Sequence, residues 1–164
     1  MIDVRPIGPD DRRAVAQFLT LNGGTTVIGH GVTYDATALP GLIVERVGEI
    51  DGLLTYDVQG DDFEVVTLHA AERRTGVGTA LLSAAIELAR KAGAKRLWLI
   101  TTNDNVDALR FYQRRGLRII GVAPGAVDES RKVKPTIPET GDYGIPPRDE
   151  LTLELPLSPE ASGR

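Results

Sequence analysis

The chain has 164 residues, 41% of them hydrophobic, which favours one compact domain with a hydrophobic core. Its net charge of −4 argues against nucleic-acid binding, and the absence of cysteine excludes thiol catalysis, disulfides and cysteine-based zinc sites. With only two histidines, His30 and His69, we expect no metal centre. No apolar run reaches the roughly 18 residues of a membrane span and no signal peptide is evident, so a cytoplasmic protein that does not enter membranes is expected.

The N-terminal part of the chain predicts a strand, a helix, an irregular segment and three further strands. Residues 2–7 alternate in polarity as a strand does, and Asp10 or Asp11 is placed to cap the helix that follows. Residues 25–40 show no sustained periodicity and are expected to be irregular. The helix is expected to end near Leu21 with Val15, Phe18 and Leu19 inward, and the three strands of a meander are expected at residues 41–47, 49–57 and 62–69.

A buried strand followed by a glycine-rich helix start is the strongest chemical signal in the chain. Residues 64–69 are β-branched and apolar, and Gly76-Val77-Gly78 then opens a helix that ends near Gly93. The first N–H groups of a helix lack partners and its dipole is positive there, so an anion can approach the glycines, with Arg73 and Arg74 adding charge. A tight turn with two solvated arginines is the alternative to a phosphate site. The expected inward face is Val77, Leu81, Ala84, Ala85, Leu88 and Ala92, widened by Leu82 and Ile86.

This glycine turn differs from two familiar phosphate-binding loops. A P-loop needs Gly-Lys-Ser/Thr, whereas Thr79 and Ala80 follow Gly78. A dinucleotide-binding turn needs a third glycine, and Leu81 stands there instead. A mononucleotide-binding α/β protein is therefore disfavoured but stays open as an alternative.

The C-terminal part predicts strands that alternate with two short helices. Residues 94–100 are almost continuously apolar at their end and indicate a strand buried on both faces, with Trp98 in the core. Asp104 or Asn105 is placed to cap a helix that ends at Gly116. The long connection 124–148 is of a length that is usually functional or mobile. Further expectations are Val106, Leu109 and Tyr112 on one helix face, a strand at 118–122, a short helix at 126–132 and a strand at 150–155.

Two motifs resemble signatures of the GNAT superfamily of acyl-CoA-dependent N-acyltransferases. Arg73-Arg74-Thr75-Gly76-Val77-Gly78 is similar to Arg/Gln-x-x-Gly-x-Gly/Ala, which holds the coenzyme A pyrophosphate in that family. Asn105-x-x-Ala108-x-x-Phe111-Tyr112-x-x-x-Gly116-Leu117 resembles the second signature, Asn-x-x-Ala-x-x-Phe-Tyr-x-x-x-Gly-Phe, at the expected distance. The segment from Thr101 onward resembles an uncharacterised bacterial branch of the superfamily.

The resemblance implies an α+β fold with three layers. Its central sheet is mixed, mostly antiparallel and of six to seven strands, with helices on both faces and one splayed pair of parallel strands. We expect a single domain over residues 1–157 and a flexible tail at 158–164. A homodimer is one expectation, since dimers are frequent in the family.

The resemblance also implies acetyl-CoA as co-substrate, no metal, and a small-molecule or peptide amine as acceptor, which attacks directly in a ternary complex. The Leu68 N–H would polarise the thioester carbonyl, and Asn105 would bind the pantetheine arm. Tyr112 corresponds to the family tyrosine proposed as general acid to the thiolate, which a phenol with a pKa of about 10 suits; a purely packing tyrosine is the alternative. Expected cofactor-binding residues are Val66, Leu68, His69, Ala70, Arg73, Arg74, Thr75, Gly76, Val77, Gly78, Thr79, Asn105 and Tyr112.

The general base is the least determined role. Glu64 is our candidate, and Asp62 shares its strand face by parity. Solvated strand-end charges, with bulk water taking the proton, explain both carboxylates equally well. The parity of His69 is opposite to that of Leu68, which predicts packing beneath a neighbouring helix. Residues 25–40, including His30, and residues 124–148 are expected to select the acceptor, and a non-catalytic acyl-CoA-binding sensor is the alternative function.

Overall fold

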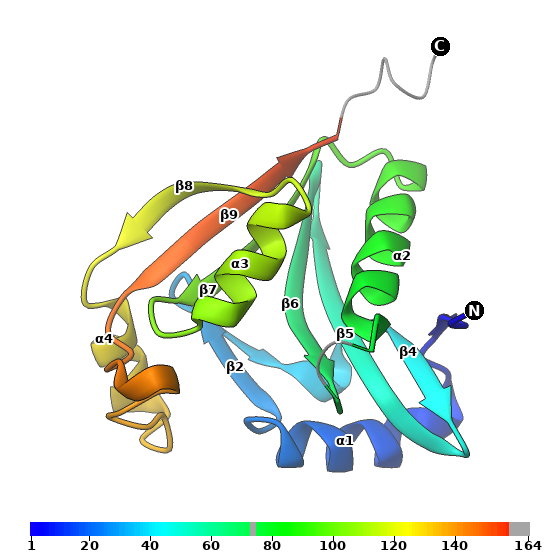
Figure 1. Ribbon diagram of the computed structural model, residues 1–164, viewed down its shortest axis with the longest axis horizontal. Helices are drawn as coiled ribbons and strands as arrows, with labels where there is room; N and C mark the ends of the chain where they lie inside the picture. Colours follow the sequence, from blue (N-terminus) through cyan, green and yellow to red (C-terminus); the bar gives the residue numbers. More distant parts are fainter. Residues whose placement is uncertain (73–74, 158–164) are drawn as a thin grey trace. The chain divides into compact units, whose positions relative to one another are not determined.

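The computed structural model describes residues 1–72 and 75–157. Its strands are β1 (Arg5–Pro6), β2 (Thr26–Gly29), β3 (Val32–Asp35), β4 (Gly41–Arg46), β5 (Glu49–Gln59), β6 (Asp62–Ala70), β7 (Arg96–Thr102), β8 (Arg118–Ala123) and β9 (Glu150–Pro156). Its α-helices are α1 (Arg12–Leu21), α2 (Val77–Lys91), α3 (Val106–Arg114) and α4 (Ala126–Val133) (Figure 1).

Within the described residues, seven strands form a mixed sheet in the order β1-β4-β5-β6-β7-β9-β8, and β2 and β3 form a separate two-stranded sheet. The pairs β1–β4, β4–β5, β5–β6 and β8–β9 are antiparallel, so the sheet is mostly antiparallel as expected. This confirms the predicted fold class, while the splay of the parallel pair β6–β7 stays a prediction.

The chain divides into two compact units. The first consists of residues 1–27 and 34–97 together with Leu157, and the second of residues 28–33 and 98–156. The first unit therefore contains the glycine-rich helix start, and the second contains the Asn105–Tyr112 motif.

In the first unit, α1 covers one face of the β4–β5 sheet. Val15, Phe18 and Leu19 are buried as predicted, and they form one hydrophobic cluster with Ile43 and Leu53. The start of this region differs from expectation, because the strand shortens to β1 and a 3-10 helix (Pro9–Asp11) precedes α1. The Asp11 carboxylate does not cap α1; it accepts hydrogen bonds from the Gly8 N–H at 2.6 Å and from the Arg5 guanidinium at 2.7 Å.

Helix α2 packs on β5 of the same unit through a glycine. A side chain at Gly52 would begin 2.3 Å from Val77 Cγ1 and 2.9 Å from Leu81 Cδ1, so the helix lies directly on the strand backbone. The expected inward position of Ala92 is wrong, because α2 ends at Lys91 and Ala92 is exposed beyond it. The buried residues of α2 are Val77, Leu81, Leu82, Ala85 and Ala89.

A β-bulge interrupts the alternation of β6. The register passes from Thr55–Thr67 directly to Tyr56–Val65, which leaves Val66 without an opposite residue on β5. A bulge of this kind bends a strand and changes which residues share a face. Glu64 therefore lies on the same face as Thr67, whereas uninterrupted alternation would have placed it with Leu68.

The structure corrects two expectations, one about the secondary structure of residues 25–40 and one about the burial of β7. Residues 25–40 are not irregular, because β2 and β3 pair as a hairpin and a short 3-10 helix (Ala36–Ala38) follows. Strand β7 is not buried on both faces: alternate residues are buried, and Trp98 and Ile100 on the other face are half-buried. In the second unit this face meets the hairpin tip, where the His30 ring lies 4.8 Å from the Trp98 ring.

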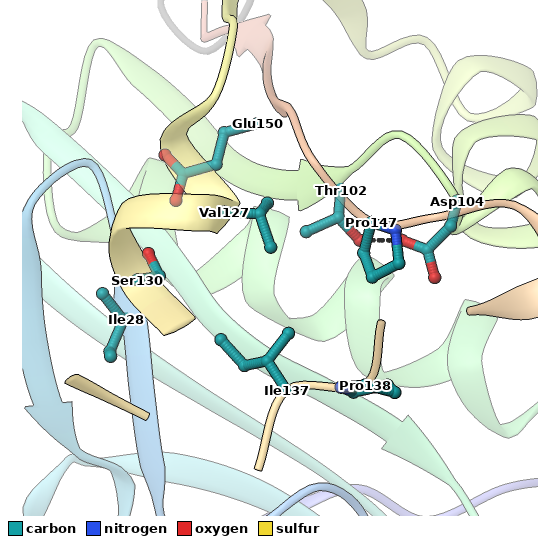
Figure 2. A pocket seen from close by; sticks show the side chains of 9 residues that line it. All are labelled: Ile28, Thr102, Asp104, Val127, Ser130, Ile137, Pro138, Pro147 and Glu150. Atoms are coloured by element: carbon teal, nitrogen blue, oxygen red, sulfur yellow. Dashed lines mark hydrogen bonds between the residues drawn. The ribbon is translucent and has the colours of Figure 1, made fainter. Parts of the chain in front are cut away.

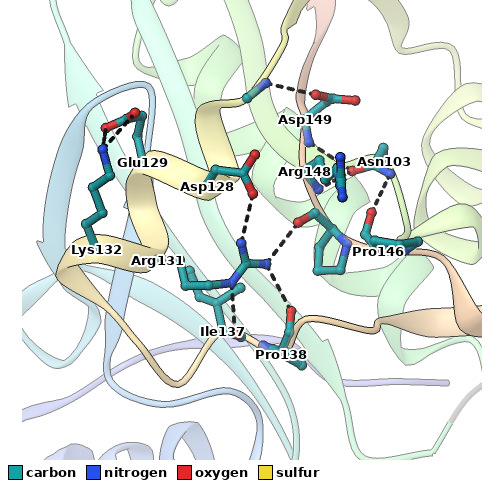
Figure 3. Close-up of polar contacts among 12 residues, drawn as sticks. Asn103, Asp128, Glu129, Arg131, Lys132, Ile137, Pro138, Pro146, Arg148 and Asp149 are labelled. Atoms are coloured by element: carbon teal, nitrogen blue, oxygen red, sulfur yellow. Dashed lines mark hydrogen bonds and ion pairs between the residues drawn. The ribbon is translucent and has the colours of Figure 1, made fainter.

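The second unit holds its long connection in place through polar contacts (Figure 3). Asn103 Oδ1 accepts from the N–H groups of Arg148 at 2.8 Å and Asp149 at 3.0 Å, and Arg131 donates to the carbonyls of Ile137, Pro138 and Pro147. The predicted short helix is confirmed as α4 and the predicted final strand as β9. Val106, expected inward, is 41% exposed because it begins α3, where the first turn is open to solvent.

Among the described residues, no helix is both long enough and apolar enough to cross a membrane. The predicted flexible tail at 158–164 lies outside the described residues.

Candidate active site

The N-terminus of α2 is open and begins at a glycine in a left-handed conformation. Gly76 has φ 86° and is exposed, as is Thr75, while the Val77 side chain is buried. The first helical bond runs from Ala80 N–H to the Gly76 carbonyl at 3.0 Å. Within the described residues no acceptor meets the N–H of Val77 or Gly78, so two donors at the positive end of a 15-residue helix are available to an anion. This arrangement fits a diphosphate; the predicted contributions of Arg73 and Arg74 lie outside the described residues.

On β6, Glu64 is buried and bound by a tyrosine that the sequence did not single out. Glu64 is only 6% exposed, and the Tyr34 hydroxyl donates a hydrogen bond to Glu64 Oε1 at 2.6 Å. Burial and the adjacent Glu64 raise the pKa of Tyr34 above its ordinary value, so the phenol keeps its proton and remains a donor. Tyr34 is near in space but 30 residues away in sequence, and no local period could have connected the two.

Asp62, the other carboxylate considered as a base, has a structural partner. Arg96 at the start of β7 donates to Asp62 Oδ1 at 2.9 Å. Nearby, the Lys95 N–H donates to the Asp61 carbonyl at 2.7 Å, which fixes the beginning of β7 beside the beginning of β6. Asp62 therefore serves the junction of these strands, and Glu64 is the better candidate base.

The remaining β6 residues are divided between the two faces of the sheet. Leu68 and Ala70 lie opposite Leu54 and Gly52, on the face that α2 covers. His69 lies opposite Leu53, on the face that α1 covers, and burial lowers the pKa of its imidazole, which favours the neutral form. Val66 occupies the bulge, and the Thr55 and Thr67 hydroxyls bond each other at 2.7 Å beside it.

In the second unit, Asn105 and Tyr112 are positioned by β7 and α3. Asn105 stands immediately before α3, but its side chain does not cap the helix; Asn105 Nδ2 instead donates to Thr101 Oγ1 at 3.1 Å. Tyr112 is 8% exposed, and burial raises the pKa of its phenol to about 12. The Phe111 ring contacts the Tyr112 ring edge-on, with centroids 5.5 Å apart. A buried, protonated phenol can donate a hydrogen bond to an anion over the whole physiological pH range.

Comparison with known proteins places these residues in a family context. Residues 9–117 match the sequence model of the Acetyltransferase (GNAT) family. The uncharacterized protein YdhI of Bacillus subtilis (strain 168) is 46% identical over 108 residues, which cover 66% of this chain and 68% of that protein.

Solved structures show the same fold at lower identity. The IAA acetyltransferase from Bacillus cereus ATCC 14579 superposes with a TM-score of 0.71 at 21% identity, over 96% of this chain and 100% of that one. A Bacillus subtilis acetyltransferase solved in complex with CoA gives a TM-score of 0.68 at 18% identity, again over 96% of this chain and 100% of that one.

Proposed function

Because the chain belongs to the acetyltransferase (GNAT) family, we propose that it transfers an acetyl group from acetyl-CoA to the amine of an acceptor molecule. The transfer occurs by direct attack in a ternary complex, since the chain has no cysteine to carry the acetyl group. The observation that carries this proposal is the open, glycine-started N-terminus of α2, whose free N–H groups suit the diphosphate of coenzyme A.

In this proposal coenzyme A is bound by the residues that the sequence motifs single out. Residues 75–79 of the first unit bind the diphosphate, with Arg73 and Arg74 adding charge. Val66, Leu68, His69 and Ala70 of β6 lie along the pantetheine arm, and the bulge at Val66 supports such a site because bulges often bend strands next to active sites. Asn105 also binds the arm. When bound, the cofactor supplies the activated acetyl thioester.

Glu64 and Tyr112 have separate roles in the transfer. Glu64 accepts the proton that the amine loses as its nitrogen bonds to the acetyl carbon, and Tyr34 holds the Glu64 carboxylate in place. The carbon–sulfur bond breaks, and Tyr112 donates a hydrogen bond to the departing thiolate. A cysteine-like thiol has a pKa of about 8.5. Because the pKa of Tyr112 is raised to about 12, its phenol stabilises the thiolate more readily than it protonates it outright.

The helix N-terminus is tested by placing a carboxylate where the diphosphate belongs. Gly78→Asp is expected to weaken acetyl-CoA binding at least about tenfold by calorimetry, because like charges oppose each other there. An aspartate in the first turn favours the helix itself, so the variant should stay folded. Ser83→Asp, exposed on the same helix, makes the same charge change and should leave binding unaltered.

Turnover is measured as free thiol released from acetyl-CoA with a panel of primary amines. Thiol release that depends on an amine supports transfer, and mass spectrometry should show the acetylated amine. Binding of acetyl-CoA with no thiol release across the panel would favour the alternative of an acyl-CoA-binding sensor. Equal acetyl-CoA affinity of the wild type and Gly78→Asp would contradict the assigned cofactor site.

A further inference from the structure

The second unit contains a small pocket that the proposed catalytic residues do not line. Its volume is about 180 Å³, and it lies between the end of β7, helix α4, the start of β9 and the long connection (Figure 2). Pockets that enclose a whole drug-sized ligand are larger, roughly 300–1,000 Å³. The size therefore suits one functional group with a short carbon chain.

Glu150 gives the pocket a buried carboxylate without a cationic partner. The residue is 5% exposed, and within the described residues the only hydrogen bond of its carboxylate is the one that Oε1 accepts from the His30 N–H at 3.1 Å. Among the described residues no lysine or arginine lines the pocket, whereas a second carboxylate, Asp104, does. Within the part of the chain that the structure describes, the Asp104 carboxylate accepts only from neutral donors, the Thr102 hydroxyl at 2.5 Å and the Asp142 N–H at 3.3 Å. A buried carboxylate without a countercharge is unfavourable, so the pocket is suited to a cation.

Ser130 supplies a separate indication that a ligand binds. The residue is 9% exposed and lines the pocket from α4, and its hydroxyl has no hydrogen-bond partner among the described residues. This hydroxyl is therefore available to hydrogen-bond a group that enters the pocket. Figure 2 shows the Ser130 hydroxyl and the Glu150 carboxylate toward one end of the pocket, with Asp104 toward the other.

The rest of the lining selects an organic cation. Ile28, Val127, Ile137 and two prolines provide an apolar wall that suits a carbon chain. Two carboxylates are too few for a protein-held divalent metal, and the described residues contain no group of three or more histidine, cysteine or acidic side chains placed to hold one. An ammonium group offers three donors on an apolar chain, which matches Glu150, Ser130 and this wall.

We propose that this pocket binds an ammonium group of the acceptor and that the acceptor carries at least two amines, an inference that rests on the proposed acetyl transfer. A carboxylate beside an ammonium raises the pKa of that ammonium. The nitrogen held by Glu150 therefore stays protonated and cannot attack a thioester. A second amine on the same molecule must be the one that is acetylated.

The binding step is tested without acetyl-CoA. Butylammonium chloride is titrated into the ¹⁵N-labelled full chain, with butan-1-ol as the neutral probe of the same length. Amide shifts at Val127, Ser130 and Ile137 are expected with the ammonium and not with the alcohol. Glu150→Gln, which keeps the bond to the His30 N–H, should raise the dissociation constant at least about tenfold, and Ser130→Ala about threefold. Glu139→Gln, an exposed carboxylate in the same connection, should have no effect.

The catalytic consequence is tested by comparing diamines with monoamines of equal chain length. Diamines should have the lower KM, and Glu150→Gln should raise the KM of diamines alone while kcat changes little. Equal shifts with the alcohol, or an unchanged dissociation constant in Glu150→Gln, would overturn the pocket assignment even if amines are acetylated. Ammonium binding without any thiol release would overturn the proposed function and leave the ammonium site standing.

Discussion

A buried phenol holds its proton more tightly than an exposed one, and Tyr112 is the clearest case in this chain. Tyr112 is only 8% exposed, and burial alone raises the pKa of its phenol to about 12. Unfolding would return the pKa to about 10. The group therefore contributes stability that is fully present below about pH 10 and is lost as the pH rises from about 10 toward 12.

Alkaline unfolding should report this difference. Between pH 9 and pH 11, the wild type is expected to lose about 1 kcal/mol more unfolding free energy than Tyr112→Phe, which has no proton to release. The measurement is urea unfolding at both pH values. Tyr34 titrates in both proteins, so its raised pKa does not enter the comparison. The same loss in both proteins would show that Tyr112 is not buried as described.

The same substitution tests the proposed role of Tyr112 in chemistry. Tyr112→Phe should lower kcat about a hundredfold and leave acetyl-CoA affinity nearly unchanged, because the phenol acts on the thiolate only as it departs. Tyr143→Phe is the matched control: Tyr143 is 72% exposed, and its hydroxyl bonds Asp107. An unaltered kcat in Tyr112→Phe would remove this residue from the mechanism.

At the scale of elements, the contact between α2 and β5 determines where the helix N-terminus lies. Gly52 allows Val77, the first residue of α2, to pack against the strand backbone. The two N–H groups proposed to bind diphosphate are those of Val77 and its neighbour Gly78. The position of the proposed anion site is thus fixed by a glycine 25 positions earlier in the sequence.

Adding one methyl group at Gly52 should displace this helix. Gly52→Ala is expected to destabilise the protein by about 1–3 kcal/mol, since the new carbon would lie 2.3 Å from Val77 Cγ1. It should also weaken acetyl-CoA binding. Urea unfolding and calorimetry measure the two effects. Gly121→Ala in β8, where the nearest atom is 3.9 Å away, should leave the stability within about 0.5 kcal/mol, and equal stabilities of the two variants would contradict the close packing.

At the scale of the whole molecule, the sequence predicted what depends on local periodicity. The three-strand meander, α1, α2 and the short helix α4 each follow from apolar spacing and glycine or proline boundaries within one segment. The hairpin β2–β3 was missed because its strands are four residues each and its residues are mixed in polarity. The bulge at Val66 was not predicted, because a bulge leaves no mark in a single strand's sequence.

The residues of the candidate site also fall into those that the local sequence predicts and those that depend on contacts between distant segments. Gly76, Gly78, Asn105 and Tyr112 could be named from the sequence because a family signature spells them out, and their roles stay predictions. The Tyr34–Glu64 bond and the Glu150 pocket depend on which distant segments meet, and neither has a local pattern. The chain also passes from one compact unit to the other after residues 27, 33, 97 and 156, so neither unit is continuous in sequence.

Val66, the extra residue of β6, could be deleted without changing which residues of β6 share a face. Removing Val66 would bring Val65 and Thr67 together against Tyr56 and Thr55, which are already consecutive on β5. Every neighbour would keep its present side of the sheet, and only the bend would disappear. A protein that lacks this single amino acid should thus retain its layers. Its stability and its acetyl-transfer rate, compared with those of the wild type, would separate the effect of the β6 bend on folding from its effect on catalysis.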